Sequence, residues 1–419
     1  MKKKSFVITS FLFFYYLILL GQPKLAPTDS ISIQFETSPS INEFNYNVLT
    51  KPIVQTHTSI IGLGEGTHGT GDFTQVKSRI VKQLVGLHGF KNFLLEAGYV
   101  DCLQIDAYIN NADINIDSVL TRLLPWPWGS QEFKDLLVWM RTYNTSATTD
   151  DKIHFYGIDV CTSVTLNKKS PVYYGNVSSL PIIRKALEIY NHTQLSSKQK
   201  QKQLSQLQKE SDKKYNKQGS NFLQCTNIIQ SAKSKLYNGG KSRGYRENEL
   251  FEMVKRIKNS KPNTEKFILW AHNEHITQRS NSRKSLGFFL NKEYKNKYQT
   301  VGFDFVKGSF CAVDIDSLYQ GKKKFGVIFY REAPEKTVAR QLESINKGVL
   351  FIDLTLPKNK NALCSKKRYI QSIGATYGNS IAQKKPKLFL QKIKLCKSFN
   401  YMFIIKNTTA SQLLVKQKR

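Results

Sequence analysis

The sequence predicts an α/β protein in which a mostly parallel sheet is flanked by helices and a helical cap is inserted into the chain. A short apolar run, Ile60–Leu63, is followed by apolar residues from Phe73 to Val85 that recur at intervals of three and four. This is the pattern of a buried strand followed by an amphipathic helix. A second apolar run, 92–96, completes a strand–helix–strand unit. The segment 180–261 is rich in Lys, Gln and Ser with apolar residues at helical intervals, which indicates the inserted cap.

Further apolar runs extend this pattern along the chain. They predict strands at residues 153–158, 266–271, 299–306, 310–315, 326–331 and 349–354. Helical spacing predicts helices at residues 105–108, 117–124, 132–143, 247–257 and 335–345. Asp72 is expected to cap the first helix, and residues 26–54 to form a polar loop. We therefore expect one α/β domain over residues 50–380, with the helical insert at 180–255 inside it and a basic C-terminal segment at 381–419.

The composition is strongly basic, with 419 residues and a formal net charge of +32. Such a charge raises the question of a nucleic-acid partner. The lysines are spread over the whole chain and interleaved with Asn, Ser and Gln, as in residues 358–368, which is typical of a solvated surface. We expect no nucleic-acid partner. The six cysteines form no CxxC pair, so neither a zinc knuckle nor a dense disulfide framework is indicated.

The N-terminus has the features of a targeting segment. Lys2, Lys3 and Lys4 precede an apolar run at residues 6–20, which ends before Gln22. A basic stretch followed by such a run is typical of a signal peptide, and its length is at the short end for a membrane span. We expect residues 1–25 to be a signal peptide or an uncleaved anchor that associates the protein with a membrane. The protein is then exported: periplasmic, extracellular or anchored at the membrane.

Chemically informative residues follow the first predicted strand. The stretch from Ile60 to Asp72 reads IIGLGEGTHGTGD, and it places Glu65 and His68 where the strand gives way to the helix. Open α/β sheets bind their ligands at this position, outside the carboxyl ends of the strands. We expect the glycines to let the backbone fold tightly, so that Glu65 and His68 face one cavity.

The same turn also fits G-x-G-x-x-G, the fingerprint of a dinucleotide-binding loop, with Glu96 placed to bind a ribose. Two features count against that reading. Glu65 would direct a negative charge at the pyrophosphate, and the helix begins too late for its first amides to hold the phosphates. We therefore favour a cavity for proton-transfer chemistry.

Other candidate residues lie at the ends of neighbouring predicted strands. Glu96 ends the second strand, and His272 and His275 follow the strand at 266–271. A histidine acts as a general base when a carboxylate sets its tautomer and basicity, and both Glu65 and Glu96 approach His68 if their strands are adjacent. Trp126, Trp128 and Trp139 are expected to pack mainly in the core, with a substrate-binding wall as the alternative.

Five motifs in this order resemble the erythromycin esterase family. They are LGEGTHGTGDF at 63–73, GFKNFLLEAGY at 89–99, FYGIDV at 155–160, the helix that starts at Arg246, and WAHNEHI at 270–276. The resemblance implies an α/β/α core with a helical cap. It also implies hydrolysis of an ester or lactone, such as a macrolide antibiotic, by a water molecule that a histidine activates without a covalent intermediate.

The resemblance assigns roles to individual residues. It implies that His68 is the general base and that Glu65 orients it. The other matching residues are Glu96, His272 and His275, expected to be catalytic, and Lys77 and Arg246, expected to bind substrate. Met253 and Glu274 depart from the family pattern and change the pocket, which bears on macrolide binding.

We thus expect a hydrolase with a small-molecule ester or lactone as its partner and with no cofactor and no metal. Two alternatives stay open. His and Glu side chains at strand ends also suit a cation, which would make the protein a metal-dependent hydrolase or peptidase. The resemblance extends to a wider superfamily that includes metallopeptidases and haem binders. The pocket would otherwise belong to a non-catalytic protein that only holds a ligand.

Overall fold

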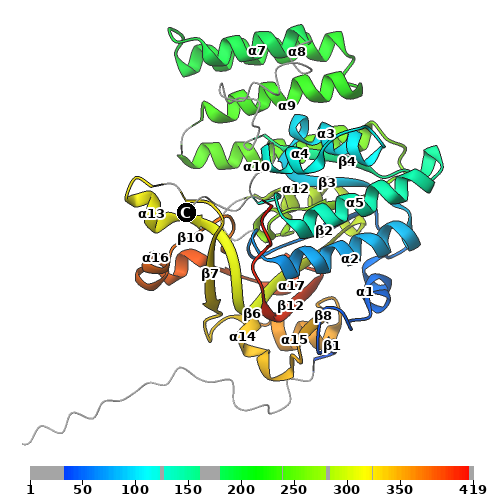
Figure 1. The fold of residues 1–419 in the computed structure, drawn as a ribbon, viewed down its shortest axis with the longest axis vertical. Helices are drawn as coiled ribbons and strands as arrows, with labels where there is room; N and C mark the ends of the chain where they lie inside the picture. The colour runs from blue at the N-terminus through cyan, green and yellow to red at the C-terminus, as the bar shows by residue number, and fades with distance from the viewer. Residues whose placement is uncertain are drawn as a thin grey trace, which may run out of the picture. The chain divides into compact units, whose positions relative to one another are not determined.

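The computed structural model describes residues 33–122, 127–160, 180–237, 239–279, 284–322 and 324–414 (Figure 1). The chain from Ile33 on forms one compact unit. The targeting segment expected at residues 1–25 lies outside the described residues, as does Trp126. Within the described ranges, no helix is both long and apolar enough to cross a membrane.

A mostly parallel sheet forms the centre of this unit. The strands are β1 (Phe35–Ser38), β2 (Ile60–Leu63), β3 (Phe90–Gly98), β4 (His154–Asp159), β5 (Lys266–Trp270), β6 (Tyr298–Asp314), β7 (Val327–Glu332), β8 (Val349–Asp353), β10 (Thr376–Tyr377) and β12 (Tyr401–Thr408). Their order is β1-β8-β12-β6-β2-β5-β3-β4, with β7 and β10 also paired to β6. From β12 to β4 every neighbouring pair is parallel, whereas β8, β1 and β7 pair antiparallel. A separate antiparallel pair joins β9 (Arg368–Gln371) and β11 (Leu390–Ile393).

The central strands are apolar because both faces of the sheet are covered. All four residues of β2 are buried, and so are the last four of β5. Buried parallel strands of this kind read as continuous apolar runs rather than as alternating patterns. The expected α/β class is therefore confirmed, and the parallel strands end together at one edge of the sheet.

Helices pack on this sheet, and all of those before β4 except α1 fall in segments where the sequence predicts a helix. Those between β1 and β4 are α1 (Tyr46–Ile53), α2 (Gly71–His88), α3 (Tyr99–Ile109), α4 (Ile116–Arg122) and α5 (Gln131–Ser146). Helix α2 packs against α5 and β3, and α3 packs against β4. Thr70, not Asp72, is the N-cap of α2. The carboxylate of Asp72 instead accepts hydrogen bonds from the backbone N–H (2.5 Å) and the hydroxyl (2.8 Å) of Thr409.

The described residues between β4 and β5 form four helices. They are α7 (Pro181–Asn191), α8 (Ser197–Lys214), α9 (Gly219–Lys235) and α10 (Gly239–Asn259), and Figure 1 shows α7 and α8 at the top with α9 and then α10 below them. Helix α9 contacts α7, α8 and α10, while α10 also contacts β4. Leu204 and Leu207 are buried on the inner face of α8, as their spacing indicates. Helix α10 is therefore the element that joins the insert to the sheet.

The remaining helices are short and lie after β5. They are α11 (Asn273–Ile276), α12 (Leu286–Tyr294), α13 (Ile315–Tyr319), α14 (Val338–Gln341), α15 (Pro357–Cys364), α16 (Asn379–Lys384) and α17 (Leu395–Ser398). The helix expected at 335–345 is α14 followed by a 3-10 turn at Glu343–Ile345. The two strands expected at 299–306 and 310–315 are one long strand, β6.

The domain boundaries expected at residues 50 and 380 are wrong. Residues 26–54, expected to be a loop, contain β1 and α1, and β1 pairs with β8. The basic segment at 381–419 contains β12, which lies between β6 and β8 inside the sheet. Residues Tyr401 to Ile405 of β12 are buried. The α/β core therefore extends over nearly all of the described chain.

One disulfide is present in the C-terminal part of the core. It joins Cys364 at the end of α15 to Cys396 in α17, with a Cα–Cα separation of 5.7 Å. The cysteines at 102, 225 and 311 are free and buried. Disulfides persist mainly in oxidising compartments, so this bond bears on where the protein works.

Candidate active site

The turn after β2 is held in place by segments that are distant in sequence. A Cβ atom at Gly64 would lie 2.1 Å from the side-chain oxygen of Asn273, so this position needs glycine for space. Its φ is not positive, and neither is that of Gly66, so conformational freedom is not the reason for the glycines here. The amide of His68 donates to the carbonyl of Gly374 at 3.2 Å.

Four backbone amides in and around this turn donate to the protein itself. Besides His68, Gly64 donates to Val301 and Gly71 donates to Thr409, each at 2.9 Å. Gly69 donates to the hydroxyl of Thr67. A phosphate-binding loop needs such amides to point at its ligand. The geometry therefore agrees with rejecting the dinucleotide-binding interpretation.

Glu65 is the centre of the first polar cluster. Its carboxylate accepts a hydrogen bond from Nδ1 of His68 at 2.5 Å, one from Nζ of Lys77, and one from Nε1 of Trp270 at 3.1 Å. Burial alone would raise the pKa of Glu65, but the charge of Lys77 and the bond to His68 lower it to about 2. Glu65 is therefore an anion fixed by three donors.

Lys77, which was expected to bind substrate, is fully buried. The side chain has no exposed surface, pairs with Glu65, and lies 3.8 Å above the ring of Trp270. Burial lowers the pKa of Lys77 to about 8, while the neighbouring Glu65 opposes that shift. Lys77 thus positions Glu65 from the protein interior and does not face a ligand.

His68 is the one member of this cluster that reaches solvent, with 11% of its side chain exposed. Nδ1 is bonded to Glu65, and Nε2 has no hydrogen-bond partner among the residues that the structure describes. A carboxylate at Nδ1 fixes the proton there and leaves the Nε2 lone pair available. His68 therefore has the geometry of a general base.

Glu96 is the centre of a second cluster. Strand β5 lies between β2 and β3, so the two strands are not adjacent, which was the condition for Glu96 to approach His68. Its carboxylate accepts from Nη2 of Arg246 at 2.8 Å, from Nε2 of His275 at 3.0 Å and from the backbone N–H of His272 at 2.9 Å. The pKa of Glu96 lies well below its usual value, because His275 and Arg246 outweigh the effect of burial.

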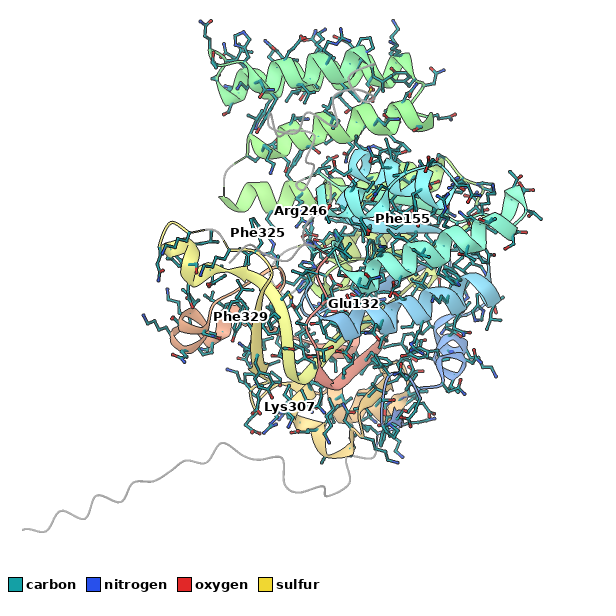
Figure 2. All side chains as sticks on the ribbon, viewed as in Figure 1. Glu132, Phe155, Arg246, Lys307, Phe325 and Phe329 are labelled. Carbon is teal, nitrogen blue, oxygen red and sulfur yellow. A yellow bond between two sulfur atoms is a disulfide. The ribbon has the colours of Figure 1, made fainter. Side chains whose placement is uncertain are left out.

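Arg246 joins this cluster to the helical insert. It extends from α10 at the boundary between the insert and the sheet (Figure 2). Nε and Nη2 donate to the two oxygens of Asp159, at 3.0 and 2.7 Å, in the forked geometry that guanidinium and carboxylate groups favour. Its side chain is 21% exposed. Arg246 is therefore held by two carboxylates and stays partly exposed.

His275 is a buried cation between two acids. Its Nε2 lies 3.0 Å from Glu96 and its Nδ1 lies 2.8 Å from Glu247. Burial would lower the pKa of His275, but Glu247 and Glu96 raise it to about 10. An imidazolium that is charged at neutral pH cannot accept a proton, so His275 positions Glu96 and is not a base.

His272 is neutral and its tautomer is fixed by its surroundings. Burial and the nearby His68 lower its pKa to about 4. Its Nδ1 accepts the backbone N–H of Glu274 at 3.3 Å, so the proton lies on Nε2, which is 3.3 Å from the carbonyl oxygen of Gly66. The rings of His272 and His68 are 5.3 Å apart. His272 is therefore an N–H donor beside the base.

Of the two expected tryptophans that the structure describes, Trp128 lies beside His68. Trp128 is buried with its ring 6.1 Å from that of His68, and it also contacts Phe133 and Trp270. Trp139 does not join it and packs against Tyr143 on the exposed side of α5. Trp128 is therefore both a core residue and part of the surface beside His68, the two positions that we considered for these tryptophans.

Glu274 connects three segments at the mouth of the site. It pairs with Arg243 of α10 and accepts a hydrogen bond from the hydroxyl of Ser372 at 2.6 Å. The pKa of Glu274 is lowered to about 2, because His272, Ser372 and Arg243 outweigh burial. The family departure at this position thus introduces a link between the insert and the C-terminal half of the core.

Two residues of the site were missed from the sequence. Asp159 is the last residue of β4, and its position at the carboxyl end of a parallel strand could have identified it as a candidate site residue. Glu247 follows Arg246 on α10, and nothing in its local sequence marked it. Both depend on where α10 docks, which the sequence pattern does not determine.

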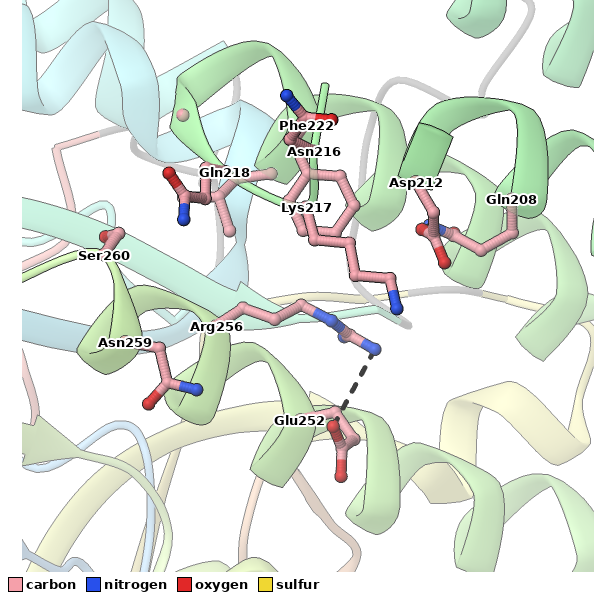
Figure 3. A pocket seen from close by; sticks show the side chains of 12 residues that line it. Gln208, Asp212, Asn216, Lys217, Gln218, Phe222, Glu252, Arg256, Asn259 and Ser260 are labelled. Carbon is pink, nitrogen blue, oxygen red and sulfur yellow. Dashed lines mark hydrogen bonds and ion pairs between the residues drawn. The ribbon is translucent and has the colours of Figure 1, made fainter. Parts of the chain in front are cut away.

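A separate pocket lies within the helical insert (Figure 3). Its walls come from the α8–α9 connection and from the C-terminal half of α10. Arg256 lies in it and forms a long ion pair with Glu252, 3.9 Å apart, while Phe222 is buried beside them. None of the candidate active-site residues lines this pocket.

No metal centre is evident in the part of the chain that the structure describes. No group of three or more His, Cys, Asp or Glu side chains there has an arrangement that could hold a metal ion. His68, His272 and His275 each use ring nitrogens for the protein contacts given above.

The fold and the site define an α/β protein with a histidine–carboxylate pair at the carboxyl edge of its parallel strands. The model of the erythromycin esterase family matches residues 85–408. The chain therefore belongs to the erythromycin esterase family. The turn that carries Glu65 and His68 precedes the matched region.

Individual relatives agree with this family. Erythromycin esterase type II of Escherichia coli is 28% identical over 122 residues, which is 29% of this chain and 28% of the relative. The alignment thus covers less than a third of that protein.

Solved structures resemble this chain over nearly its whole length. A succinoglycan biosynthesis protein has a TM-score of 0.70 at 21% identity, covering 91% of this chain and 96% of its own. A Bacillus cereus protein has a TM-score of 0.71 at 22% identity, covering 90% and 96%. A mutant of the erythromycin esterase EreC in its open conformation has a TM-score of 0.64 at 15% identity, covering 92% and 100%. At these identities the likeness concerns the fold.

Proposed function

We propose that this protein hydrolyses a carboxylic ester or a lactone and that His68 is the general base. The contact that carries this proposal is the bond from Nδ1 of His68 to the buried carboxylate of Glu65, at 2.5 Å. Since that bond occupies Nδ1 and leaves the Nε2 lone pair available, the ring is arranged to take a proton from water. His272 and His275 are unsuited to this role, because one is a committed N–H donor and the other is a cation.

The reaction then follows from these contacts. Nε2 of His68 removes a proton from a water molecule while the water oxygen attacks the carbonyl carbon, and the imidazolium formed is stabilised by Glu65. The tetrahedral intermediate collapses, the ester C–O bond breaks, and the proton moves from His68 to the leaving alkoxide. Lys77 and Trp270 keep Glu65 in place throughout.

Arg246 suits the developing negative charge on the carbonyl oxygen, because it is a fixed positive charge held by Asp159 and Glu96. Donors that are fixed before the reaction lower its barrier most effectively. The ring of His272 lies 5.3 Å from that of His68, but its single N–H already contacts the carbonyl oxygen of Gly66 at 3.3 Å, so His272 holds the turn in place. Glu96 and His275 then act through Arg246 rather than on the substrate.

Export is part of the same proposal. The basic and apolar N-terminal pattern supports a signal peptide or an anchor. The disulfide between Cys364 and Cys396 supports an oxidising compartment. We infer that the protein acts outside the cytoplasm on a small-molecule ester or lactone.

A hydrolysis screen tests the proposal. Purified protein is incubated with macrolide lactones and simple carboxylic esters, and products are identified by the mass of one added water. We expect one class to be hydrolysed, with turnover falling about 100-fold to 10,000-fold in His68→Asn, which keeps a hydrogen bond to Glu65 but cannot act as a base. His57→Asn, at an exposed position outside the site, is the matched control and should retain full activity. Binding of a candidate without any mass change would favour the non-catalytic alternative.

A further inference from the structure

Exposed apolar side chains gather on one lobe of the molecule. This lobe consists of α13, β7, β10, α16 and the 3-10 turn at Pro386–Phe389, with their connections, and we call it the lysine–apolar lobe. Nine large apolar side chains are exposed among the described residues, and six belong to the lobe: Leu318, Tyr319, Phe325, Ile328, Tyr330 and Leu388. Figure 1 shows α13, β7 and α16 together at one side of the sheet. Such a concentration marks an interaction surface.

The lobe is well packed on its inner side. Phe329 of β7 contacts Tyr377, at a ring distance of 5.1 Å, and Tyr377 contacts Phe389 at 4.7 Å. Ile328 and Tyr330, on either side of Phe329 in the strand, point away from this core and are 67% and 60% exposed. The apolar residues are therefore presented to solvent by a fixed scaffold.

Hydrogen bonds also join the helices of the lobe. The carboxylate of Asp316 in α13 accepts the backbone N–H groups of Ser380 at 2.8 Å and Ile381 at 3.3 Å. This acid therefore helps to hold α16 against α13.

Lysines surround the apolar residues. Lys322, Lys324, Lys384, Lys385 and Lys387 are all exposed. Among the described residues of the lobe, Glu332 is the one exposed acid. The surface therefore combines tyrosine, aliphatic side chains and an excess of positive charge, and the chain as a whole carries +32.

We propose that the lysine–apolar lobe binds the surface of a membrane that contains anionic lipids. Tyrosine rings suit the boundary between head groups and acyl chains, because one end is apolar and the other is polar. Lysine stems lie along apolar surface while their ammonium groups reach the lipid phosphates. A second copy of the chain is a poor partner, since two such lobes would bring their lysines together. The proposal is independent of the ester chemistry.

Vesicle sedimentation tests the proposal. The protein beginning at Gln22 removes the apolar run at 6–20, which would itself bind lipid, and retains the compact unit that starts at Ile33. It is mixed with vesicles of phosphatidylcholine alone or of equal parts phosphatidylcholine and phosphatidylglycerol. We expect binding to the second kind only. Ile328→Ser with Tyr330→Ser should reduce that binding about tenfold or more.

Substitution of lysines provides a second arm with a matched control. Changing Lys384, Lys385 and Lys387 to Gln should also reduce binding about tenfold or more. Changing Lys198, Lys202 and Lys209 to Gln removes the same charge from exposed positions on α8 and should leave binding to the vesicles unchanged. Unchanged circular dichroism shows that each variant is folded.

Three results would overturn the proposal. One is the absence of binding to anionic vesicles, and another is an equal loss in the α8 control, which would mean that total charge alone determines binding. The third is a lipid-free dimer, seen by light scattering, that Ile328→Ser with Tyr330→Ser abolishes. That result would assign the lobe to self-association.

Discussion

Replacing Glu65 by Gln separates the two consequences of its position. In the wild type, the carboxylate neutralises Lys77, which has no exposed surface, and orients His68. Glu65→Gln leaves a buried ammonium without its counter-charge, and breaking a buried ion pair in this way costs about 3–5 kcal/mol of unfolding free energy. Turnover should also fall about 100-fold or more, because His68 loses the carboxylate that sets its tautomer and stabilises its protonated form.

A second substitution distinguishes these effects. Glu65→Gln combined with Lys77→Met removes both charges, and apolar replacement of a buried pair is close to neutral for stability. We expect urea unfolding to show the double variant within about 1 kcal/mol of wild type, while ester turnover stays as low as in Glu65→Gln. Recovery of turnover together with stability would refute the reasoning, because Glu65 would then matter only for folding.

Four further predictions concern the charge network, the disulfide and export. The stability difference between wild type and Glu65→Gln should vanish as the pH falls from 4.5 toward 2, since the folded-state pKa of Glu65 lies below its ordinary value and its contribution is lost on protonation. The ion pairs of His275 should contribute fully to the unfolding free energy below pH 6.5, and this contribution should be lost as the pH rises through about 10, because the folded-state pKa of His275 is raised. Thermal unfolding measured from pH 6 to pH 10 would show the loss. Reduction of the Cys364–Cys396 bond, which joins residues 32 apart, should lower the unfolding free energy by about 3–4 kcal/mol without abolishing turnover, as chemical denaturation with and without reductant would show. The exported protein should begin near Gln22 by N-terminal sequencing, and an intact first residue on a soluble cytoplasmic protein would contradict export.

The local sequence was sufficient to predict the part of the site that contains Glu65 and His68. The change from a buried run to helical spacing places β2, the turn and α2, and Glu65 and His68 share that turn. Their contact follows from three residues of separation. The contact between Lys77 and Glu65 could not be predicted from the sequence, because it depends on how α2 packs over Trp270 in the folded protein.

The second half of the site could not be predicted, because the sequence does not determine the order of the strands in the sheet. The sequence predicts that Glu96 and His68 lie at the same edge, but it does not show that β5 separates their strands. The docking of α10 brings Arg246 and Glu247 to Asp159 and His275, and no local pattern encodes that contact. Strand β12 was missed for a different reason. Its apolar residues at 401–405 are flanked by lysines, and the overall basic character obscured a buried strand.

The most direct test of the central claim is hydrolysis after exhaustive chelation. Wild-type protein and His68→Asn are stripped of metal ions and assayed on the ester or lactone that the screen identifies. If His68 activates water as a general base, stripped wild type keeps most of its activity and His68→Asn is about 100-fold to 10,000-fold slower. If stripped wild type is inactive and added zinc restores turnover, the site is a metal centre and the general-base account is wrong.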